Sequence, residues 1–448
     1  MLFTRLYRRS VKDAAESCGE DEDMVSALKL LRGAACAALA ALTGGILYYN
    51  VSLPDNYLVT GGENLKLGEH IAVRSESIIP ENYSFYLQCP QNAAAMSGAL
   101  ASRTEQLTLF GVFPIKNVNV TEVAEPVVIP CGTPFGIKLM TEGVLVVELT
   151  GFDTGDGIIS PAREAGIDEG DVIVSISGKP VSGNKDVSRI IEESGGKTLG
   201  VELIRSGEHR VVFLKPSKAA SDDSYRAGMW VRDSSAGIGT VTFYDPSTGI
   251  FAGLGHPVCD TDTGEMLTMS CGEAADVYIS GVKKSTAGAP GELIGMFTSD
   301  KASGSLLVNS ECGVYGKMGS SPTLKSAVPV AMRQEVQAGA AEIYATISGC
   351  EPECYSVEIE KIDMGNSTDC RNMVIHVTDE RLLDKAGGIV QGMSGSPIIQ
   401  NGKLVGAVTH VLVRDPTRGY GIFADTMLEC AKSAARSEEH TSELQSLP

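Results

Sequence analysis

Gly387–Pro397 reads GGIVQGMSGSP, and this stretch decides how the rest of the sequence is interpreted. It places Ser394 among small residues, between Gly392 and Gly395. Glycine adopts positive φ angles without a Cβ clash, so this backbone can turn sharply and expose one hydroxyl group. Such a turn can direct the N–H groups of Gly392, Met393 and Ser394 at one point, as an oxyanion hole requires. The pattern predicts a reactive serine, and the alternative is a Gly/Ser loop between strands.

The residues that follow have the pattern of a β-hairpin. Ile398-Ile399 and 404–408 are apolar, and Asn401-Gly402 between them is a typical hairpin turn. A serine on a tight turn before a hairpin is the arrangement found in chymotrypsin-like peptidases. Ser396, which also follows a glycine, is the reserve nucleophile.

Composition limits the fold and the kind of partner. The 448 residues suffice for two or three domains of about 100–200 residues each. Fifty glycines and 6% aromatic residues suit turn-rich β structure better than helical bundles. The formal net charge of −19 argues against nucleic acid as a partner, because phosphate binding requires a basic surface.

The 11 cysteines are scattered, and only Cys350, Cys354 and Cys370 lie near one another. A zinc site normally uses four ligands at closer, paired spacings. We therefore expect no metal and no cofactor, and thiols that are free or casually paired.

The two ends of the chain carry no site. Residues 1–32 are polar and predict a cytoplasmic segment, and residues 28–49 are apolar enough for a signal anchor, with the bulk of the protein outside the cytoplasm. A cleaved signal peptide or a buried helix are the alternatives for residues 28–49.

In residues 50–130, apolar and polar residues alternate, which predicts a β-rich connecting segment. Residues 436–448 resemble the translation of a sequencing adapter, so we expect a non-native tail there.

Residues 131–216 resemble a PDZ domain. The motif SPAxxAGIxxGDxIxxIxG spans 160–178 and predicts a short helix, two glycine turns and a strand. A second helix is expected over 186–194 and a hairpin over 201–214. In PDZ domains an extended peptide adds to a sheet edge, and backbone N–H groups bind its carboxylate. By resemblance, the peptide-binding loop contains Phe135, Gly136 and Ile137; the alternative is a PDZ domain that only packs against its neighbour.

From residue 225 to 432 the sequence consists of short strands separated by glycine turns. His256 ends one β run between Gly255 and Pro257, so it is held by a stiff backbone yet close to open space. A general base needs this combination of orientation and access. His376 and His410 lie in other strands, and we interpret His410 as cleft wall or structural support. The alternative for His256 is a histidine whose hydrogen bonds are satisfied by local backbone.

Taken together, the chain resembles the stage IV sporulation protein B peptidases of endospore-forming bacteria. The likeness covers about residues 30–432. It rests on the N-terminal apolar segment, the PDZ motif, and the stretches FGVFPIKNV, WVRDSSAGIGTVTFYDP, GLGHPVCD, VTDERLLDKAGGIVQGMSGSPIIQNGKLVGAVTHVLVRDP and GYGIF. The resemblance implies a mainly β fold, with a chymotrypsin-like double β-barrel preceded by a PDZ domain and a membrane helix.

The resemblance also implies a catalytic triad. Its nucleophile falls on Ser394, its base on His256 and its acid on Asp379 in the VTD sequence. Chymotrypsin-like enzymes usually take the aspartate from the first barrel. Four aspartates closer to His256 therefore remain as alternatives: Asp260, Asp262, Asp276 and Asp300.

The function implied is that of a membrane-anchored serine endopeptidase in sporulation signalling. Such an enzyme would work between the forespore and mother cell membranes. There it would cleave a membrane-bound regulator, and itself, to trigger activation of a late sigma factor. Two alternatives remain, a PDZ adaptor without activity and a general extracytoplasmic quality-control protease.

Overall fold

The computed structural model describes residues 29–68, 70–75, 99–205, 207–261, 263–299, 301–319, 326–365 and 370–446. The chain falls into two compact units, residues 1–124 and 125–448, and each is described by itself.

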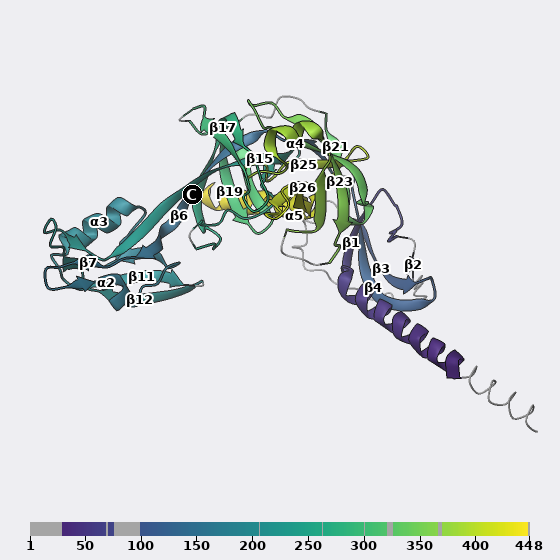
Figure 1. The fold of residues 1–448 in the computed structure, drawn as a ribbon, viewed down its shortest axis with the longest axis horizontal. Coiled ribbons are helices and arrows are strands. Elements are labelled where there is room, and N and C mark those ends of the chain that lie inside the picture. Colours follow the sequence, from purple (N-terminus) through teal and green to yellow (C-terminus); the bar gives the residue numbers. More distant parts are fainter. Residues whose placement is uncertain are drawn as a thin grey trace, which may run out of the picture. The chain divides into compact units, whose positions relative to one another are not determined.

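The first unit joins an apolar helix to a small sheet. The helix Lys29–Ser52 has a mean hydropathy of 1.7 and is long and apolar enough to cross a membrane, although a signal sequence meets the same criteria. It is the purple helix of Figure 1. The sheet has the order β1-β4-β3-β2. Its strands are β1 (Asn56–Thr60), β2 (Ile71–Ser75), β3 (Ala99–Leu109) and β4 (Phe113–Val123). Leu42, Ile46 and Tyr49 of the helix pack against the core of this sheet.

The second unit contains a first six-stranded barrel. Its strands pair in the ring β6-β17-β19-β20-β16-β15, and β15 closes the ring by pairing with β6. They are β6 (Pro134–Leu149), β15 (Met229–Asp245), β16 (Ile250–Gly253), β17 (Met269–Lys283), β19 (Gly304–Ser310) and β20 (Gly313–Met318). Three further strands extend it: β5 (Val127–Pro130), β18 (Glu292–Phe297) and β21 (Val328–Pro329). Phe135, Phe251 and Leu306 lie in its core.

A second barrel follows, with the closed order β22-β23-β24-β27-β26-β25. Its strands are β22 (Gly339–Ala345), β23 (Glu353–Ile362), β24 (Met373–Val377), β25 (Pro397–Gln400), β26 (Lys403–Val411) and β27 (Arg418–Phe423). A 3-10 turn, η1 (Arg333–Glu335), precedes it, and the helix α4 (Glu380–Ala386) leads into the Ser394 loop. The mainly β fold with two barrels, predicted from the sequence, is confirmed.

The domain predicted to be a PDZ domain is inserted between two strands of the first barrel. The elements between β6 and β15 are β7 (Phe152–Asp153), β8 (Ile158–Ile159), α2 (Pro161–Glu164), β9 (Val172–Ile176), β10 (Lys179–Pro180), α3 (Asn184–Glu193), β11 (Leu199–Arg205), β12 (Glu208–Leu214), β13 (Ser217–Lys218) and β14 (Tyr225–Arg226). Both predicted helices and the predicted hairpin are present (Figure 1). Val187, Ile190 and Ile191 of α3 bury the apolar face of that helix.

Two long strands connect this insertion to the barrel. The second half of β6 pairs with β9 of the insertion, and its first half pairs with β17 of the barrel. β15 runs antiparallel to β6 from Met229 to Thr240, with irregular register near Trp230 and Arg232. β6 and β15 therefore belong to both parts.

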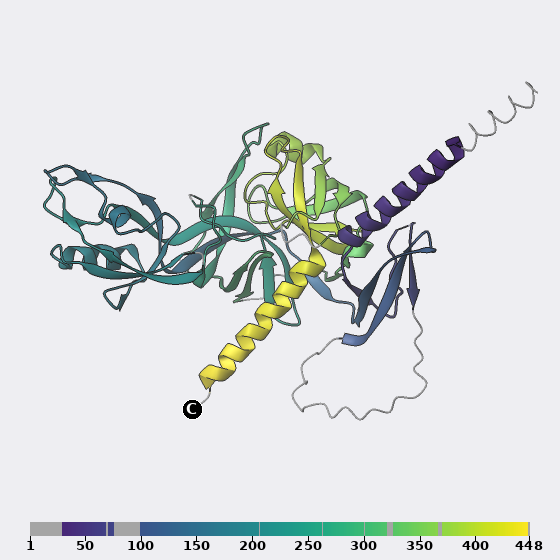
Figure 2. The same ribbon diagram turned by 90° about the horizontal axis from the view of Figure 1, so that it is seen from below.

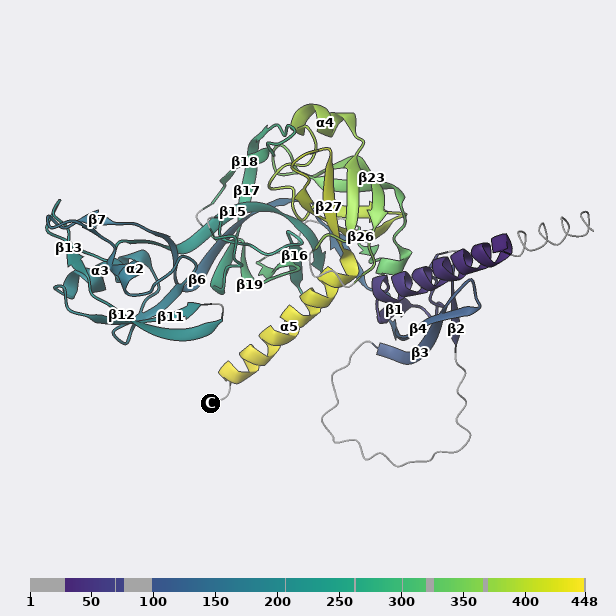
Figure 3. The ribbon, with the colours of Figure 1, turned by 60° about the horizontal axis from the view of Figure 1, so that its bottom comes forward.

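The chain then enters the helix α5 (Ala424–Ser446), which packs against the second barrel and against β16 and β20 of the first. Figures 2 and 3 show it as the yellow helix. Residues 436–446 of the predicted non-native tail continue this helix, and Glu438 forms an ion pair with Lys317 of β20.

Candidate active site

Thr240 of β15 joins the first barrel to the turn that carries Ser394. Its backbone N–H donates to the carbonyl oxygen of Ser394 at 2.9 Å. Its hydroxyl group donates to the carbonyl oxygen of Gly392 at 2.8 Å. Thr240 is 2% exposed, so both hydrogen bonds are shielded from water. Breaking a buried hydrogen bond is costly, because its donor and acceptor are then left without a partner.

Gly395 allows the two barrels to approach backbone to backbone. Its φ is +96°, and a Cβ atom at this position would lie 2.0 Å from the carbonyl oxygen of Thr240 and 2.6 Å from the amide nitrogen of Leu254. No side chain fits into these distances. Leu254 lies two residues before His256, so the serine turn of the second barrel contacts the segment of the first barrel that carries the histidine.

The two serines of the motif differ in access. The Ser394 side chain is half-buried, and its hydroxyl group donates to the carbonyl oxygen of Thr409 at 2.7 Å. Ser396 is fully buried, and its hydroxyl group donates to the carbonyl oxygen of Met393 at 2.7 Å. A substrate can reach only an exposed hydroxyl, so the geometry favours Ser394 over the reserve nucleophile.

His256 follows β16 after two residues in the left-handed region, Leu254 with φ 67° and Gly255 with φ 71°. Its Nδ1 lies 2.7 Å from the carbonyl oxygen of Pro257. Because a carbonyl oxygen only accepts hydrogen bonds, Nδ1 carries the proton in this arrangement and Nε2 keeps a lone pair. Burial lowers the pKa of His256 below its ordinary value of 6.5, although the bond to Pro257 opposes this shift. The ring is therefore neutral at neutral pH and able to accept a proton.

A second histidine packs against this ring. The centroids of the His256 and His410 rings are 4.7 Å apart, with 36° between their planes. Burial, followed by repulsion from His256 and Arg371, lowers the pKa of His410 to about 4. His410, interpreted from the sequence as cleft wall or structural support, therefore lies against the candidate base. His376 lies on β24, where its Nδ1 is 3.5 Å from Glu360.

The three predicted oxyanion donors are not equivalent. The N–H of Met393 donates to the carbonyl oxygen of Val390 at 3.1 Å. Within the described part of the chain, the N–H groups of Gly392 and Ser394 have no hydrogen-bond partner. Those two remain able to bind a developing negative charge.

The structure does not bring Asp379 to His256. Asp379 caps the N-terminus of α4 by accepting from the N–H of Arg381 at 2.9 Å. Its carboxylate also accepts from the Arg381 guanidinium at 2.9 and 3.1 Å, and from the N–H of Ser356 at 3.3 Å. The hydrogen bond to Arg381 is the main cause that lowers the pKa of Asp379 to about 2. Among the described residues, these partners account for its hydrogen bonds, and His256 is not one of them.

The alternative aspartates are not placed better. Asp260 is buried, forms an ion pair with Arg232 of β15, and accepts from the N–H of Thr263 at 3.0 Å. Asp276 lies exposed on β17. Asp262 and Asp300 lie outside the described residues.

The peptide-binding loop predicted at Phe135, Gly136 and Ile137 is instead part of the barrel strand β6. Phe135 and Ile137 are buried, and Phe135 pairs with Gly239 of β15 on one side and Asp276 of β17 on the other. Gly136 lies between them, and a Cβ atom there would lie 2.1 Å from the Phe297 ring. Because both edges of β6 are paired here, no edge remains for a peptide. In the insertion, β6 is the strand that pairs with residues 229–231 of β15 within the described part of the chain, so the other edge of these three residues has no strand partner there.

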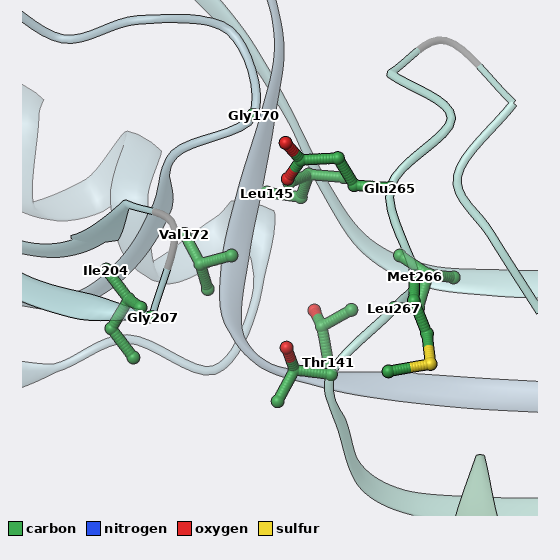
Figure 4. Close-up of a pocket in the computed structure, with 10 residues that line it drawn as sticks. Thr141, Leu145, Gly170, Val172, Ile204, Gly207, Glu265, Met266 and Leu267 are labelled. Atoms are coloured by element: carbon green, nitrogen blue, oxygen red, sulfur yellow. The ribbon is translucent and has the colours of Figure 1, made fainter. Parts of the chain in front are cut away.

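A pocket of about 410 Å³ lies beside the segment that follows His256 (Figure 4). Its walls come from β6, from Gly170, Val172 and Ile204 of the insertion, and from residues 265–268. Leu267 in this wall donates its N–H to the carbonyl oxygen of Val258 at 3.0 Å. Sequence reasoning did not find this pocket, because its residues come from three separate segments.

Comparison with known protein families finds a match for the peptidase region and another for the PDZ region of the chain. Residues 223–428 match a family described as SpoIVB peptidase S55, and residues 159–213 match the PDZ domain family. Serine protease HTRA1 of Xenopus laevis and of Xenopus tropicalis are each 38% identical over 78 residues. This region is 17% of the present chain and 15% of each relative. The PDZ domain of an SdrC-like protein from Listeria monocytogenes covers 20% of this chain and 87% of its own, at 18% identity and a TM-score of 0.17.

Replacing Asp379 by asparagine separates a capping role from a catalytic one. We expect Asp379→Asn to lower the free energy of unfolding at pH 7 by about 1 kcal/mol, because asparagine can still cap α4 but loses the ion pair with the exposed Arg381. Wild type loses this advantage as the pH falls from 4 towards 2, so urea unfolding curves of the two proteins should converge there.

The exposed Asp384 on the same helix provides the control, and Asp384→Asn should change little. A capping role also predicts that a serine-directed fluorophosphonate labels folded Asp379→Asn within a few-fold of the wild-type rate. A loss of roughly 10⁴-fold would instead identify Asp379 as the acid of a triad.

Proposed function

Because this chain belongs to the SpoIVB peptidase S55 family and contains a PDZ domain, we propose that it is a serine endopeptidase with Ser394 as nucleophile and His256 as general base. The contact between the Gly392–Gly395 turn and the Thr240 and Leu254 backbones carries this proposal. It supports a shared site because the serine turn touches Leu254, two residues before His256, although 138 positions separate Ser394 from His256 in the sequence.

In the proposed reaction, the Ser394 hydroxyl leaves the Thr409 carbonyl and turns towards Nε2 of His256. Its oxygen attacks the substrate carbonyl carbon while Nε2 takes its proton. The N–H groups of Gly392 and Ser394 then hold the oxyanion. The imidazolium returns the proton to the leaving amine, and water repeats the sequence to release the acyl group.

The carbonyl of Pro257 has the orienting role in this scheme. It selects the Nδ1–H tautomer, which is the part that a triad aspartate plays in positioning the ring. Asp379 supports the scheme indirectly, by capping the helix that leads into the Gly387–Pro397 loop.

We extend the proposal to the substrate. The family and the helix Lys29–Ser52 support a membrane-anchored enzyme whose substrate is a membrane-bound regulator of sporulation, with late sigma-factor activation as the outcome. By the same reasoning the enzyme acts between the forespore and mother cell membranes and cleaves itself. A half-buried Ser394 and a neutral His256, carried by two segments that touch at Gly395 and Leu254, speak against an inactive adaptor.

The proposed activity is tested by self-cleavage. Purified wild type should be processed over time, whereas Ser394→Ala and His256→Ala should show at most about one part in 10³–10⁶ of that rate. Ser396→Ala is the matched control, because it removes a buried hydroxyl of the same motif and should retain processing. Mass mapping of the products gives the cleavage positions. Equal processing of Ser394→Ala and wild type would disprove the nucleophile.

The pH dependence tests the base. His256 must be neutral to accept a proton, and its pKa lies below 6.5, so Ser394 labelling by a fluorophosphonate should rise with pH and reach half its plateau below pH 6.5. Labelling rates from pH 4 to pH 8 measure this midpoint. A midpoint well above 6.5 would contradict a buried neutral histidine as the base.

We further propose that the PDZ domain binds peptides at the edge of β15 over 229–231 that lies opposite β6. Met229 and Val231 pack against the same core as α3, and the N–H of Asn184 at the start of α3 donates to Asp233 of β15 at 2.9 Å. This is a strand edge beside a helix, the geometry to which PDZ domains add a peptide strand.

The sole tryptophan of the chain, Trp230, lies on this edge and is 63% exposed. A binder selected on the full chain from a library of free C-terminal peptides should therefore change tryptophan emission in a saturable way. The same peptide added to Trp230→Phe should leave emission unchanged. Binding without any change in wild-type emission would place the docking site elsewhere.

A further inference from the structure

Three cysteine side chains meet beside the candidate active site. Cys312 lies in the turn between β19 and β20, Cys370 precedes β24, and Cys430 lies on α5. Cys370 is buried in a core cluster that also holds Tyr315, and the partly buried Cys312 and Cys430 pack against this cluster. The three thiols thus come from the first barrel, the second barrel and the last helix.

Direct contacts place Cys370 against the turn of Cys312. The Cys370 thiol donates to the carbonyl oxygen of Glu311 at 2.6 Å. The Tyr315 hydroxyl donates to the carbonyl oxygen of Cys312 at 3.0 Å and holds the same turn. The hydrogen bond with Cys370 is the first cause that raises the pKa of Cys312 to about 11, and Cys312 also contacts the Cys430 thiol.

The Cys370 segment contacts Thr409, the partner of Ser394, and the Cys312 turn packs near His256. The carbonyl oxygen of Cys370 accepts from the Thr409 hydroxyl at 2.9 Å, and Thr409 in turn accepts from Ser394. On the other side, a Cβ atom on Gly313 would lie 2.6 Å from the carbonyl oxygen of Gly253 and 3.1 Å from the nitrogen of Gly255. The Cys312 turn therefore packs against the segment that leads to His256.

We propose that Cys312 and Cys370 form a disulfide bond when the protein meets an oxidising thiol–disulfide pool, and that this bond cross-links the two barrels behind the active site. With oxidised glutathione, one protein thiolate attacks the small disulfide and releases one glutathione. The second protein thiolate then displaces the other glutathione, so two protein thiols are oxidised and one glutathione disulfide is reduced.

The pairing and the rate follow from the contacts. Cys312 contacts both other thiols, and Cys370 is favoured over Cys430 because its thiol also donates to the carbonyl oxygen of Glu311, which holds it against the Cys312 turn. A raised pKa keeps the thiolate fraction small, so exchange is slow, which suits a structural cross-link better than a rapid sensor. A peptidase carried outside the cytoplasm would meet such a pool.

The test uses the full-length Ser394→Ala chain in detergent, so that self-cleavage does not consume the sample. Trypsin separates the three cysteines into peptides that end at Lys317, Arg371 and Lys432. After incubation with oxidised glutathione, we expect the first two peptides joined, lighter than their sum by two hydrogen atoms, and released by dithiothreitol. The melting temperature of the oxidised chain should rise by about 5–10 °C.

Matched variants make the result specific. Cys370→Ser and Cys312→Ser should both abolish the linked pair and the rise in melting temperature, whereas Cys271→Ser at an exposed position should keep both. If Cys370→Ser does not fold by circular dichroism, Cys370→Ala replaces it. A dominant link from Cys312 to Cys430, or glutathione adducts alone, would overturn the proposal. None of these readouts depends on hydrolysis, so a failure of the disulfide proposal can be distinguished from a failure of the proposed peptidase activity.

Discussion

The two hydrogen bonds that Thr240 makes with Ser394 and Gly392 are the constraint on which the site depends. They fix the serine turn of one barrel on a strand of the other, and Gly395 removes the side chain that would keep the two backbones apart. Because the same contact reaches Leu254, the position of the nucleophile and that of the base are set together. A site at a barrel interface needs such a direct backbone contact, since neither barrel alone holds both groups.

The chemistry of His256 follows from burial rather than from a neighbouring carboxylate. Burial favours the neutral ring, and the Pro257 carbonyl selects the tautomer that leaves Nε2 free. A carbonyl carries only a partial charge, however, and stabilises an imidazolium less than an aspartate does. Asp379 is held by Arg381 in a cap that lowers its pKa to about 2. The described arrangement therefore orients the base fully but stabilises its charged form only in part.

Local patterns in the sequence predicted local structure well. The PDZ motif predicted both helices and the hairpin, and the glycine turns predicted a β fold; Ser394, expected to be exposed, is half-buried. Long-range pairing was not predictable in this way: Phe135 pairs with Gly239 and Asp276, more than a hundred residues away, so a barrel strand looked like a PDZ loop. For Asp379 a local signal did exist, because an aspartate just before a helical run is a typical N-cap. The family resemblance outweighed it.

The insertion of the PDZ domain between β6 and β15 has a mechanical consequence. β15 carries the proposed peptide edge at 229–231 and contacts the Ser394 turn through Thr240, so one strand connects the proposed peptide site to the candidate nucleophile. Between these points Arg232 pairs with the buried Asp260, four residues after His256. A peptide that shifts the first residues of β15 would therefore act on the base segment through Arg232 and on the serine turn through Thr240. Since the register of β15 is irregular at Trp230 and Arg232, the strand can adjust there without breaking its pairing further along.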